Sequence, residues 1–327
     1  MLLAEYIWID SNSNFRSKTR VCEQITDWSF DGSSTDQLSY LDKAQNNTEI
    51  ILKPVHIRNN PCFITSTYTK YLSLLVWCVC YHTDGSPVVN NYFQKEWMDN
   101  EEVRTQLEEI YLGIELEFVF QPTYNKYGKQ ARWYCGYKNH QQMKERKVVQ
   151  EIVNRCLSID LPLSGMNAEV APRQWELQLF ASASLAIHDF WIMKYIIVHT
   201  AQEHELEADF SPKPLGKDYN GSGCHINIST PKTRESIDEI YRILEAAKKT
   251  HAKDIPHFGS NNHERLTGSH ETSSITEFTY GVGTRNTSVR IPIPTSQNQK
   301  GYFEDRRPAA NCNIYQVFAR WYSHLVD

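Results

Sequence analysis

Residues 113–118 read Gly-Ile-Glu-Leu-Glu-Phe, and the alternation in this stretch decides the class of fold. Apolar residues take every second position, with Glu115 and Glu117 between them, which predicts a β-strand that has one apolar and one acidic face. Two carboxylates about 7 Å apart on one face repel each other, so they indicate either water or a cation between them. Taken alone, the stretch is more typical of a solvated strand face than of a metal site.

The same period of two returns in later stretches of the chain. We expect strands at 113–120, 173–180, 222–229 and 287–293, and helices at 144–157, 188–204 and 237–251. Helices between strands could indicate a parallel sheet. Parallel strands buried on both faces, however, read as continuous apolar runs, whereas these strands alternate apolar with polar residues. The pattern therefore predicts an antiparallel sheet with one polar face.

These strands place chemically active side chains on their polar faces. Glu176 points away from the apolar residues of its strand, and Glu169 precedes it by seven residues. His225 shares one face with Asn227 and Ser229. A lone histidine on a strand is more often a hydrogen-bonded structural residue than a metal ligand, and its polar neighbours change that only a little.

The C-terminal third supplies the opposite charge. Four arginines and two acidic residues occur within 23 residues: Arg285, Arg290, Arg306, Arg307, Glu304 and Asp305. The fork of a guanidinium matches phosphate and carboxylate oxygens, although a surface salt bridge would be the ordinary explanation for any single arginine.

Taken together, these faces predict a polar cavity that holds five glutamates and one histidine opposite several arginines. Oxygen ligands with one imidazole favour Mg²⁺ or Mn²⁺ over zinc or copper. Divalent cations beside arginines are the equipment of phosphoryl transfer, in which the protein positions groups and neutralises charge. The sequence has no GxxxxGK(S/T) loop and no kinase-type glycine loop, so a nucleotide site must be of another kind.

Composition limits the classes of protein to consider. The chain has 327 residues, of which 40% are apolar and 12% aromatic, so a disordered or fibrous chain is excluded. Its 34 basic and 39 acidic residues give a net charge of −5, which argues against a nucleic-acid partner. The longest apolar stretch, 72–81, is too short to span a membrane, and no secretory signal follows Met1, so we expect a cytoplasmic protein. Its eight cysteines include no CxxC pair and indicate free, buried thiols.

The first 95 residues read differently from the rest. Short β-rich segments at 7–9, 50–52 and 72–81 alternate with turns. A helix is expected from Asn100, its N-cap, and Gly113 should stop it. We therefore expect an α+β chain of two domains, residues 1–95 and residues 96–327.

Six motifs of the chain match one family in order. They are WSFDGSST at 28–35, GIELE at 113–117, NAEVAPRQWE at 167–176, NGSGCHINIST at 220–230, RLTGSHETSSI at 265–275 and KGYFEDRRPAANC at 300–312. With these motifs the chain resembles glutamine synthetase, in its short eukaryotic-type form, from Tyr6 to about residue 318.

The resemblance implies a fold and a reaction. The fold would be a small N-terminal β-grasp domain and a larger catalytic domain, in which helices flank a curved antiparallel sheet, a half-barrel related to that of guanido kinases. The reaction would join ammonia to the γ-carboxylate of L-glutamate through γ-glutamyl phosphate, consuming ATP and giving L-glutamine, ADP and phosphate. The resemblance also implies two to three Mg²⁺ or Mn²⁺ ions per active site. It implies self-association into a ring oligomer, typically a decamer of two stacked pentamers.

The resemblance also implies roles for individual residues, according to their positions in these motifs. One metal site would consist of Glu117, Glu169 and Glu176, and the other of Glu115, His225 and Glu304. Phosphate oxygens of ATP would be bound by Arg285, Arg290 and Arg307, and other parts of the nucleotide by Asn227, Ser229, Arg234 and Tyr302. Glutamate would be bound by Asn220, Gly221, Arg265 and Arg306.

Two further carboxylates would act on the nitrogen substrate. Glu271 matches the glutamate that closes over the site and helps to deprotonate the tetrahedral adduct. Asp31 matches the aspartate that helps to bind ammonium and remove its proton, and in this family it comes from the adjoining subunit. The active site would then be complete only in the oligomer.

The chain departs from the family pattern in three places, one of which is a missing acidic run before the helix expected at 188. Phe180-Ala181 stands where the family usually has Gly-Pro, in a region that lies near the adenine in relatives. The stretch 121–140 is shortened and keeps only Trp133–Gly136 of a familiar loop. Three other functions stay open: a γ-glutamyl amine ligase with another acceptor, a catalytically silent structural relative, and a guanidino kinase on a related barrel.

Overall fold

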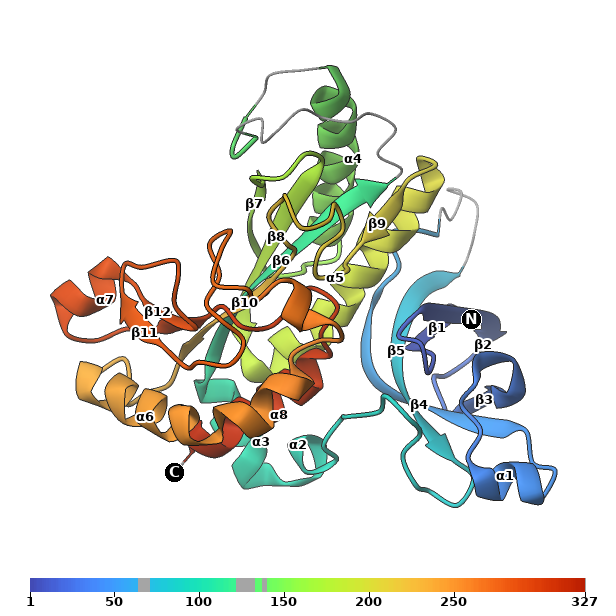
Figure 1. The fold of residues 1–327 in the computed structure, drawn as a ribbon. Coiled ribbons are helices and arrows are strands. Elements are labelled where there is room, and N and C mark those ends of the chain that lie inside the picture. Colours follow the sequence, from blue (N-terminus) through green and yellow to red (C-terminus); the bar gives the residue numbers. More distant parts are fainter. Residues whose placement is uncertain (64–70, 122–132, 137–139, 327) are drawn as a thin grey trace.

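Two β-sheets and the helices packed on them form the protein (Figure 1). The computed structural model describes residues 1–63, 71–121, 133–136 and 140–326. The N-terminal sheet has the strand order β2 (Phe15–Cys22), β1 (Leu2–Ile9), β5 (Leu72–His82), β4 (Glu49–Asn59) and β3 (Trp28–Asp31). The second, curled sheet has the order β11 (Tyr280–Val282), β12 (Val289–Ile291), β13 (Phe303–Asp305), β10 (Cys224–Ser229), β6 (Tyr111–Gln121), β8 (Gln174–Ser182) and β7 (Leu163–Ala168), with β9 (Glu207–Asp209) also paired to β6.

Helices lie at all four predicted positions, and the structure describes four further helices that were not predicted. The described helices are α1 (Tyr40–Ala44), α2 (Glu96–Asp99), α3 (Glu101–Glu109), α4 (His140–Leu157), α5 (Ala183–Glu203), α6 (Ile237–Asp254), α7 (Ile293–Asn298) and α8 (Ile314–Leu325). Asn100 caps α3 as predicted, because its side chain accepts hydrogen bonds from the backbone N–H groups of Glu102 and Val103. The helix expected from residue 188 begins earlier, at Ala183, directly after β8 ends at Ser182.

The central strands confirm the predicted alternation. Ile114, Leu116 and Phe118 are fully buried on one side of β6, and their polar neighbours face the other side. The antiparallel register places Glu117 opposite Glu176 on β8, and Glu115 opposite His225 on β10. These pairings gather the polar positions of several strands on one face.

The edge of the second sheet departs from the antiparallel prediction. β11 pairs parallel to β12. β11 has only three residues, and no alternation in the sequence predicts it. β12 in turn pairs antiparallel to β13, so the strands that carry the polar face keep the predicted arrangement.

Helix α5 covers the apolar side of the second sheet. Its side chains are buried on almost every side, including Phe190, Ile192 and Ile196, because β6 and β8 pack on one face and other helices and strands of the N-terminal sheet on the rest. A helix that is apolar all round belongs in the interior of a folded chain. None of the described helices combines the length and the apolar character that a membrane span requires.

The N-terminal sheet packs against the same helix. Trp77 of β5 stacks on Trp191 of α5, with ring centroids 4.9 Å apart. Asp189 of α5 accepts hydrogen bonds from Arg58 and lies 2.7 Å from His56 Nε2, both on β4. An aromatic stack and a buried ion pair thus join the two sheets through α5.

The domain boundary near residue 95 stays a prediction, and so does the β-grasp description of the first domain. β5 ends at His82 and α2 begins at Glu96, so the expected boundary falls between the last strand of the first sheet and the helices that precede the second. One hydrophobic cluster nevertheless includes residues from both sheets.

Candidate active site

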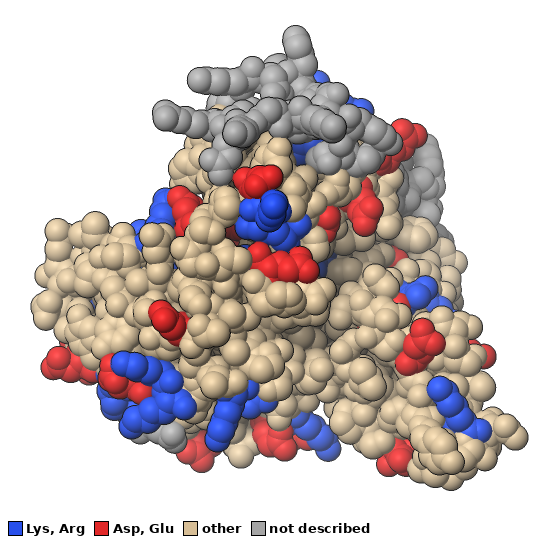
Figure 2. All heavy atoms as spheres, viewed as in Figure 1, with Lys and Arg blue, Asp and Glu red and all other residues tan. Residues whose placement is uncertain are grey.

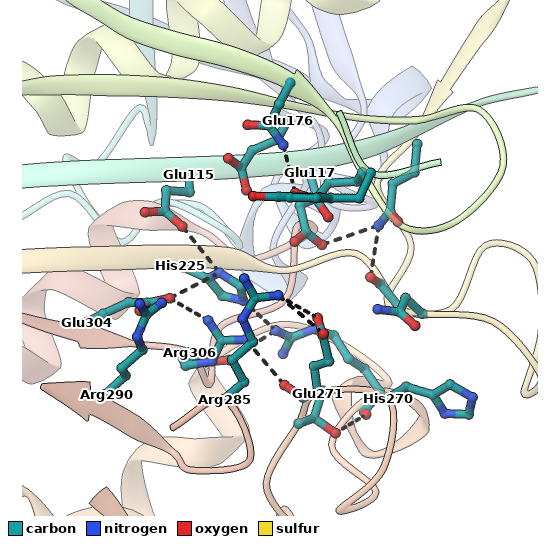
Figure 3. A pocket seen from close by; sticks show the side chains of 18 of the residues that line it. Glu115, Glu117, Glu176, His225, His270, Glu271, Arg285, Arg290, Glu304 and Arg306 are labelled. Carbon is teal, nitrogen blue, oxygen red and sulfur yellow. Dashed lines mark hydrogen bonds and ion pairs between the residues drawn. The ribbon is translucent and has the colours of Figure 1, made fainter. Parts of the chain in front are cut away.

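The polar face of the second sheet opens into a cavity of about 290 Å³ (Figure 3). All six residues predicted as metal ligands line it: Glu115, Glu117, Glu169, Glu176, His225 and Glu304. Residues predicted to bind or act on substrates line it as well: Asn220, Gly221, Arg265, Glu271, Arg285, Arg290 and Arg306. Figure 2 shows acidic and basic side chains meeting around a hollow near the centre of the molecule. Tertiary structure thus brings five separate sequence motifs to one place.

Three carboxylates form the first group in this cavity, which we call the β6–β8 triad: Glu117, Glu169 and Glu176. One oxygen of each lies within 4.8 Å of the others. The backbone N–H of Gly223 donates to Glu117 Oε2 at 2.7 Å, and the Gln178 amide donates to Glu176 Oε1 at 2.5 Å. Because like charges directly opposite each other destabilise a sheet, the triad needs protons or a cation for compensation.

Burial favours the protonated form of each carboxyl in this triad. Burial and the neighbouring Glu169 raise the pKa of Glu117 to about 8. Burial, together with Glu117 and Glu115, raises the pKa of Glu176 to about 9. Burial raises the pKa of Glu169 as well. A divalent cation compensates the same charges and gains three oxygen ligands, so the donor set fits Mg²⁺ or Mn²⁺.

A second group combines two carboxylates with an imidazole, and we call it the β6–β10–β13 triad: Glu115, His225 and Glu304. His225 Nδ1 lies 3.4 Å from Glu115 Oε2 and 3.5 Å from Glu304 Oε1. Burial and the positive charge of Arg306 lower the pKa of His225, so its ring is neutral, the form that binds metals. Two carboxylates with one neutral imidazole also fit Mg²⁺ or Mn²⁺.

Arginines face the carboxylates from the C-terminal strands (Figure 3). Arg306 donates to Glu304 Oε1 at 2.5 Å, and Arg290 donates to Glu304 Oε2 at 3.3 Å. Arg265 is buried, and its guanidinium lies 3.1 Å from His225 Nε2. This part of the cavity therefore presents positive charge and hydrogen-bond donors to an anionic ligand.

The loop that carries Glu271 bends over the cavity. His270 and Glu271 have backbone φ angles of 53° and 63°, a conformation that costs energy in residues other than glycine. Arg306 donates to the carbonyl oxygen of Glu271 at 3.2 Å, and Arg285 Nη1 lies 3.2 Å from Glu271 Oε1. These contacts hold a carboxylate at the mouth of the cavity.

A second chamber of about 450 Å³ adjoins the first and shares Glu115 and Gln178 with it. The four residues predicted for the rest of the nucleotide line this chamber: Asn227, Ser229, Arg234 and Tyr302. The side chains of Tyr111, Leu179 and Phe180 form the apolar and aromatic part of the chamber wall. The two spaces therefore form one passage with a charged end and an apolar end.

The structure contradicts the prediction that Arg307 binds phosphate. Arg307 lines neither cavity, is 1% exposed, and donates to both carboxylate oxygens of Asp305 at 2.8 and 2.9 Å. The alternation of side chains is the reason. Because Glu304 and Arg306 point into the cavity, Asp305 and Arg307 point into the core.

Asp31 also lies outside both cavities. It ends β3 in the N-terminal sheet, where the backbone N–H and the hydroxyl of Ser33 donate to its carboxylate and lower its pKa (Figure 1). Its side chain is exposed. The hypothesis that Asp31 serves an adjoining subunit stays a prediction.

Other residues of the cavity were not predicted: Tyr134, Asn167, Gln174, Gln178, His270 and Thr272. Gln174 donates to the carbonyl oxygen of Gly221 at 2.9 Å and to Glu117 Oε2 at 3.3 Å, so it positions two predicted residues. The period of two could have found Gln174 and Gln178, since they flank Glu176 on the same face. Most of the shortened stretch 121–140 lies outside the described residues.

Comparison with known proteins agrees with this geometry. Residues 95–322 match the family described as glutamine synthetase, catalytic domain. The chain is 36% identical to the glutamine synthetase of Saccharomyces cerevisiae, over 97% of this chain and 87% of the yeast protein. It is 37% identical to that of Schizosaccharomyces pombe, over 97% of this chain and 89% of the relative.

Solved structures show the same fold. The cryo-EM structure of Plasmodium falciparum glutamine synthetase superposes with a TM-score of 0.74 at 18% identity, covering 99% of this chain and 72% of the other. A structure of GmaS without ligand superposes with a TM-score of 0.70 at 20% identity, covering 100% of this chain and 78% of the other. At these identities the superpositions support the architecture alone.

Proposed function

The chain belongs to the glutamine synthetase family, and we propose how its residues make glutamine from glutamate and ammonia at the expense of ATP. One observation carries the assignment of the site. Two triads of metal-ligating residues and a set of arginines line a single cavity, and an apolar chamber continues from it. Such a passage suits a nucleotide whose triphosphate lies at the charged end and whose base lies at the apolar end.

The β6–β8 triad and the β6–β10–β13 triad are proposed to hold two divalent cations. Bound there, the cations would supply charge compensation for the phosphate oxygens of ATP. Both donor sets fit Mg²⁺ and Mn²⁺ because they consist of carboxylate oxygens and one neutral imidazole.

The arginines of the cavity are proposed to orient the two anionic substrates. Arg285 and Arg290 suit the transferring phosphoryl group, because their forks match its oxygens. Arg265 and Arg306 suit the carboxylates of glutamate, with Asn220 and Gly221 beside them. A γ-carboxylate oxygen of glutamate held there attacks the γ-phosphorus of ATP, ADP leaves, and γ-glutamyl phosphate forms.

Ammonia then replaces the phosphate. Its nitrogen attacks the acyl carbon of γ-glutamyl phosphate, and the tetrahedral adduct loses a proton before phosphate leaves. Glu271 is proposed to take that proton, because its carboxylate stands at the mouth of the cavity. Asp31 of an adjoining subunit is proposed to help bind ammonium, which requires self-association into a ring, with a decamer as the expected size.

A hydroxylamine assay tests this proposal, because hydroxylamine can replace ammonia and gives γ-glutamyl hydroxamate, which forms a coloured complex with ferric iron. We expect product from glutamate, ATP and Mg²⁺ or Mn²⁺. Glu117→Gln should lower the rate at least about a hundredfold, since it removes a ligand and charge from the β6–β8 triad. The matched control is Glu108→Gln on the exposed face of α3, which should keep full activity. Absence of hydroxamate with both metals, or full activity of Glu117→Gln, would contradict the proposal.

The cytoplasmic location also stays a proposal. All eight cysteines are free, and six of them are buried, which fits a compartment that keeps thiols reduced.

A further inference from the structure

The apolar chamber has an aromatic wall made of two neighbouring strands. Tyr111 begins β6 and Phe180 lies on β8, and their rings stack with centroids 5.6 Å apart and planes 22° from parallel. The guanidinium carbon of Arg234 lies 5.3 Å from the centre of the Tyr111 ring. Arg234 is itself held by hydrogen bonds to Ser229 Oγ and to the carbonyl oxygen of Glu109. The Tyr111 ring is therefore contacted by Phe180 from the neighbouring strand β8 and by Arg234 from the loop after β10.

Phe180 is the member of this group with free ring surface. It is 53% exposed, and among the described residues its ring stacks only on Tyr111. The register places Phe180 opposite Gly113, which has no side chain to cover the Phe180 ring. An exposed phenylalanine in a recess, supported by a second ring, is typical of a surface for an aromatic ligand.

The position of Phe180 in the passage indicates which part of a ligand would meet it. Glu115 and Gln178 lie where the chamber joins the charged cavity, and Phe180 follows Gln178 by two residues on the same face of β8. A nucleotide with its phosphates among the arginines would extend its base away from them, toward this wall.

We propose that Phe180, supported by Tyr111, stacks on the base of the nucleotide and selects a purine over a pyrimidine. This inference rests on the proposed function, which puts ATP in the passage. Two fused rings cover more of a phenylalanine ring than one ring does, so a purine gains more dispersion energy from the contact.

Equilibrium binding of MgADP and MgCDP to the purified, assembled protein tests the inference without requiring turnover. Isothermal titration calorimetry gives both dissociation constants. We expect Phe180→Ala to weaken MgADP binding about five- to tenfold, the lower part of the range for losing one base–aromatic stack. MgCDP binding should weaken by a smaller factor, because one ring covers less of the phenylalanine than two fused rings do, so the preference for the purine shrinks. Phe180→Trp should keep both the affinity for MgADP and the preference.

Two further variants control for shape and for general loss of apolar surface. Phe180→Leu keeps an apolar side chain without a flat ring, and we expect it to lose the purine preference as Phe180→Ala does. Leu157→Ala removes an apolar side chain of similar exposure at the end of α4 and should leave both affinities unchanged.

The possible failures separate the inference from the proposed function. If Phe180→Ala binds MgADP like the wild-type protein, or weakens both nucleotides equally, Phe180 does not select the base and the inference is wrong, while wild-type synthesis of glutamine would leave the proposed function intact. If the wild-type protein binds neither nucleotide, the nucleotide site itself is wrong, and both conclusions are overturned.

Discussion

Arg306 and Arg307 are adjacent in the chain and have different roles in the structure. Arg306 lies in the cavity with Glu304, whereas Arg307 lies in the core with Asp305. Phe258, Phe278 and Trp321 surround the guanidinium of Arg307, and Trp321 donates to Asp305. The motif match predicts that both arginines lie in the same site, but the direction of each side chain decides which of them can reach a ligand.

His188 shows how burial of one ionisable residue makes stability depend on pH. It lies in the interior with Nδ1 2.7 Å from the Tyr315 hydroxyl and its ring stacked on His56. Burial, with a smaller contribution from His56, lowers the pKa of His188 to about 3. In the unfolded chain its pKa returns to about 6.5. Between these values the unfolded state binds a proton that the folded state does not, so stability falls as pH falls below 6.5.

Because of His188, we expect the free energy of unfolding to be about 2 kcal/mol lower at pH 5 than at pH 7. His188→Asn keeps a polar atom near Tyr315 but cannot titrate, so its stability should fall by about 2 kcal/mol less over the same interval. Urea unfolding at the two pH values measures both differences. His263→Asn, at an exposed position, is the control and should show the wild-type difference. Equal pH dependence of wild type and His188→Asn would show that His188 is not the source.

At the scale of elements, helix α3 begins where its capping residue, Asn100, predicts. The side chain of Asn100 accepts from the N–H groups of Glu102 and Val103 at 3.0 and 3.2 Å, which satisfies two donors that the first turn leaves open. Leu107 and Ile110, at the other end, are buried in the core, and β6 with its two glutamates follows directly. The buried end of α3 therefore anchors the start of β6, the strand that carries Glu115 and Glu117, in the core.

Asn100→Ala should lower the unfolding free energy by about 1 kcal/mol, because the cap is lost while nothing in the core changes. Asn100→Asp keeps an acceptor and adds a negative charge at the N-terminus of α3, so it should match or exceed wild-type stability. Urea unfolding of the three proteins at pH 7 measures the order. Equal stability of Asn100→Ala and the wild type would mean that the cap contributes nothing to this fold.

At the scale of the whole molecule, the predicted role of Asp31 requires a second subunit, because Asp31 lies away from both cavities of its own chain. It belongs to the N-terminal sheet and lines neither cavity, so a single chain does not bring it to the residues that line the candidate site. If an adjoining subunit supplies it, two inactive variants can complement each other. A subunit with Asp31→Asn contributes an intact cavity, and a neighbour with Glu117→Gln contributes an intact Asp31.

Co-expression of these two variants in equal amounts should therefore restore about a quarter of wild-type hydroxamate activity, as random mixing in a closed ring predicts. Each variant alone should be nearly inactive. Co-expression of Glu117→Gln with Glu304→Gln is the control, because both changes lie in the same cavity and no mixture rebuilds it. No recovery with the first pair would contradict a shared site.

The alternation of residues was sufficient to predict much of this protein. Glu115 and Glu117 on one face of a strand, His225 with Asn227, and Arg290 opposite two buried residues all follow from the period of two, which is a property of the local backbone. The cap signal at Asn100 likewise placed the start of α3, because its donors are satisfied by a nearby residue in the chain. The predicted stop at Gly113 was wrong, because α3 ends at Glu109 and Gly113 lies within β6.

Only the tertiary structure decided how these faces meet. The pairing of Glu117 with Glu176, the burial of Arg307 on Asp305, and the stacking of Phe180 on Tyr111 each join positions through strand register or core packing. Such contacts depend on the relative placement of whole elements, and no local pattern contains that information. The sequence by itself therefore determined which side chains share a face, whereas the packing of strands and helices determined which faces enclose a common cavity.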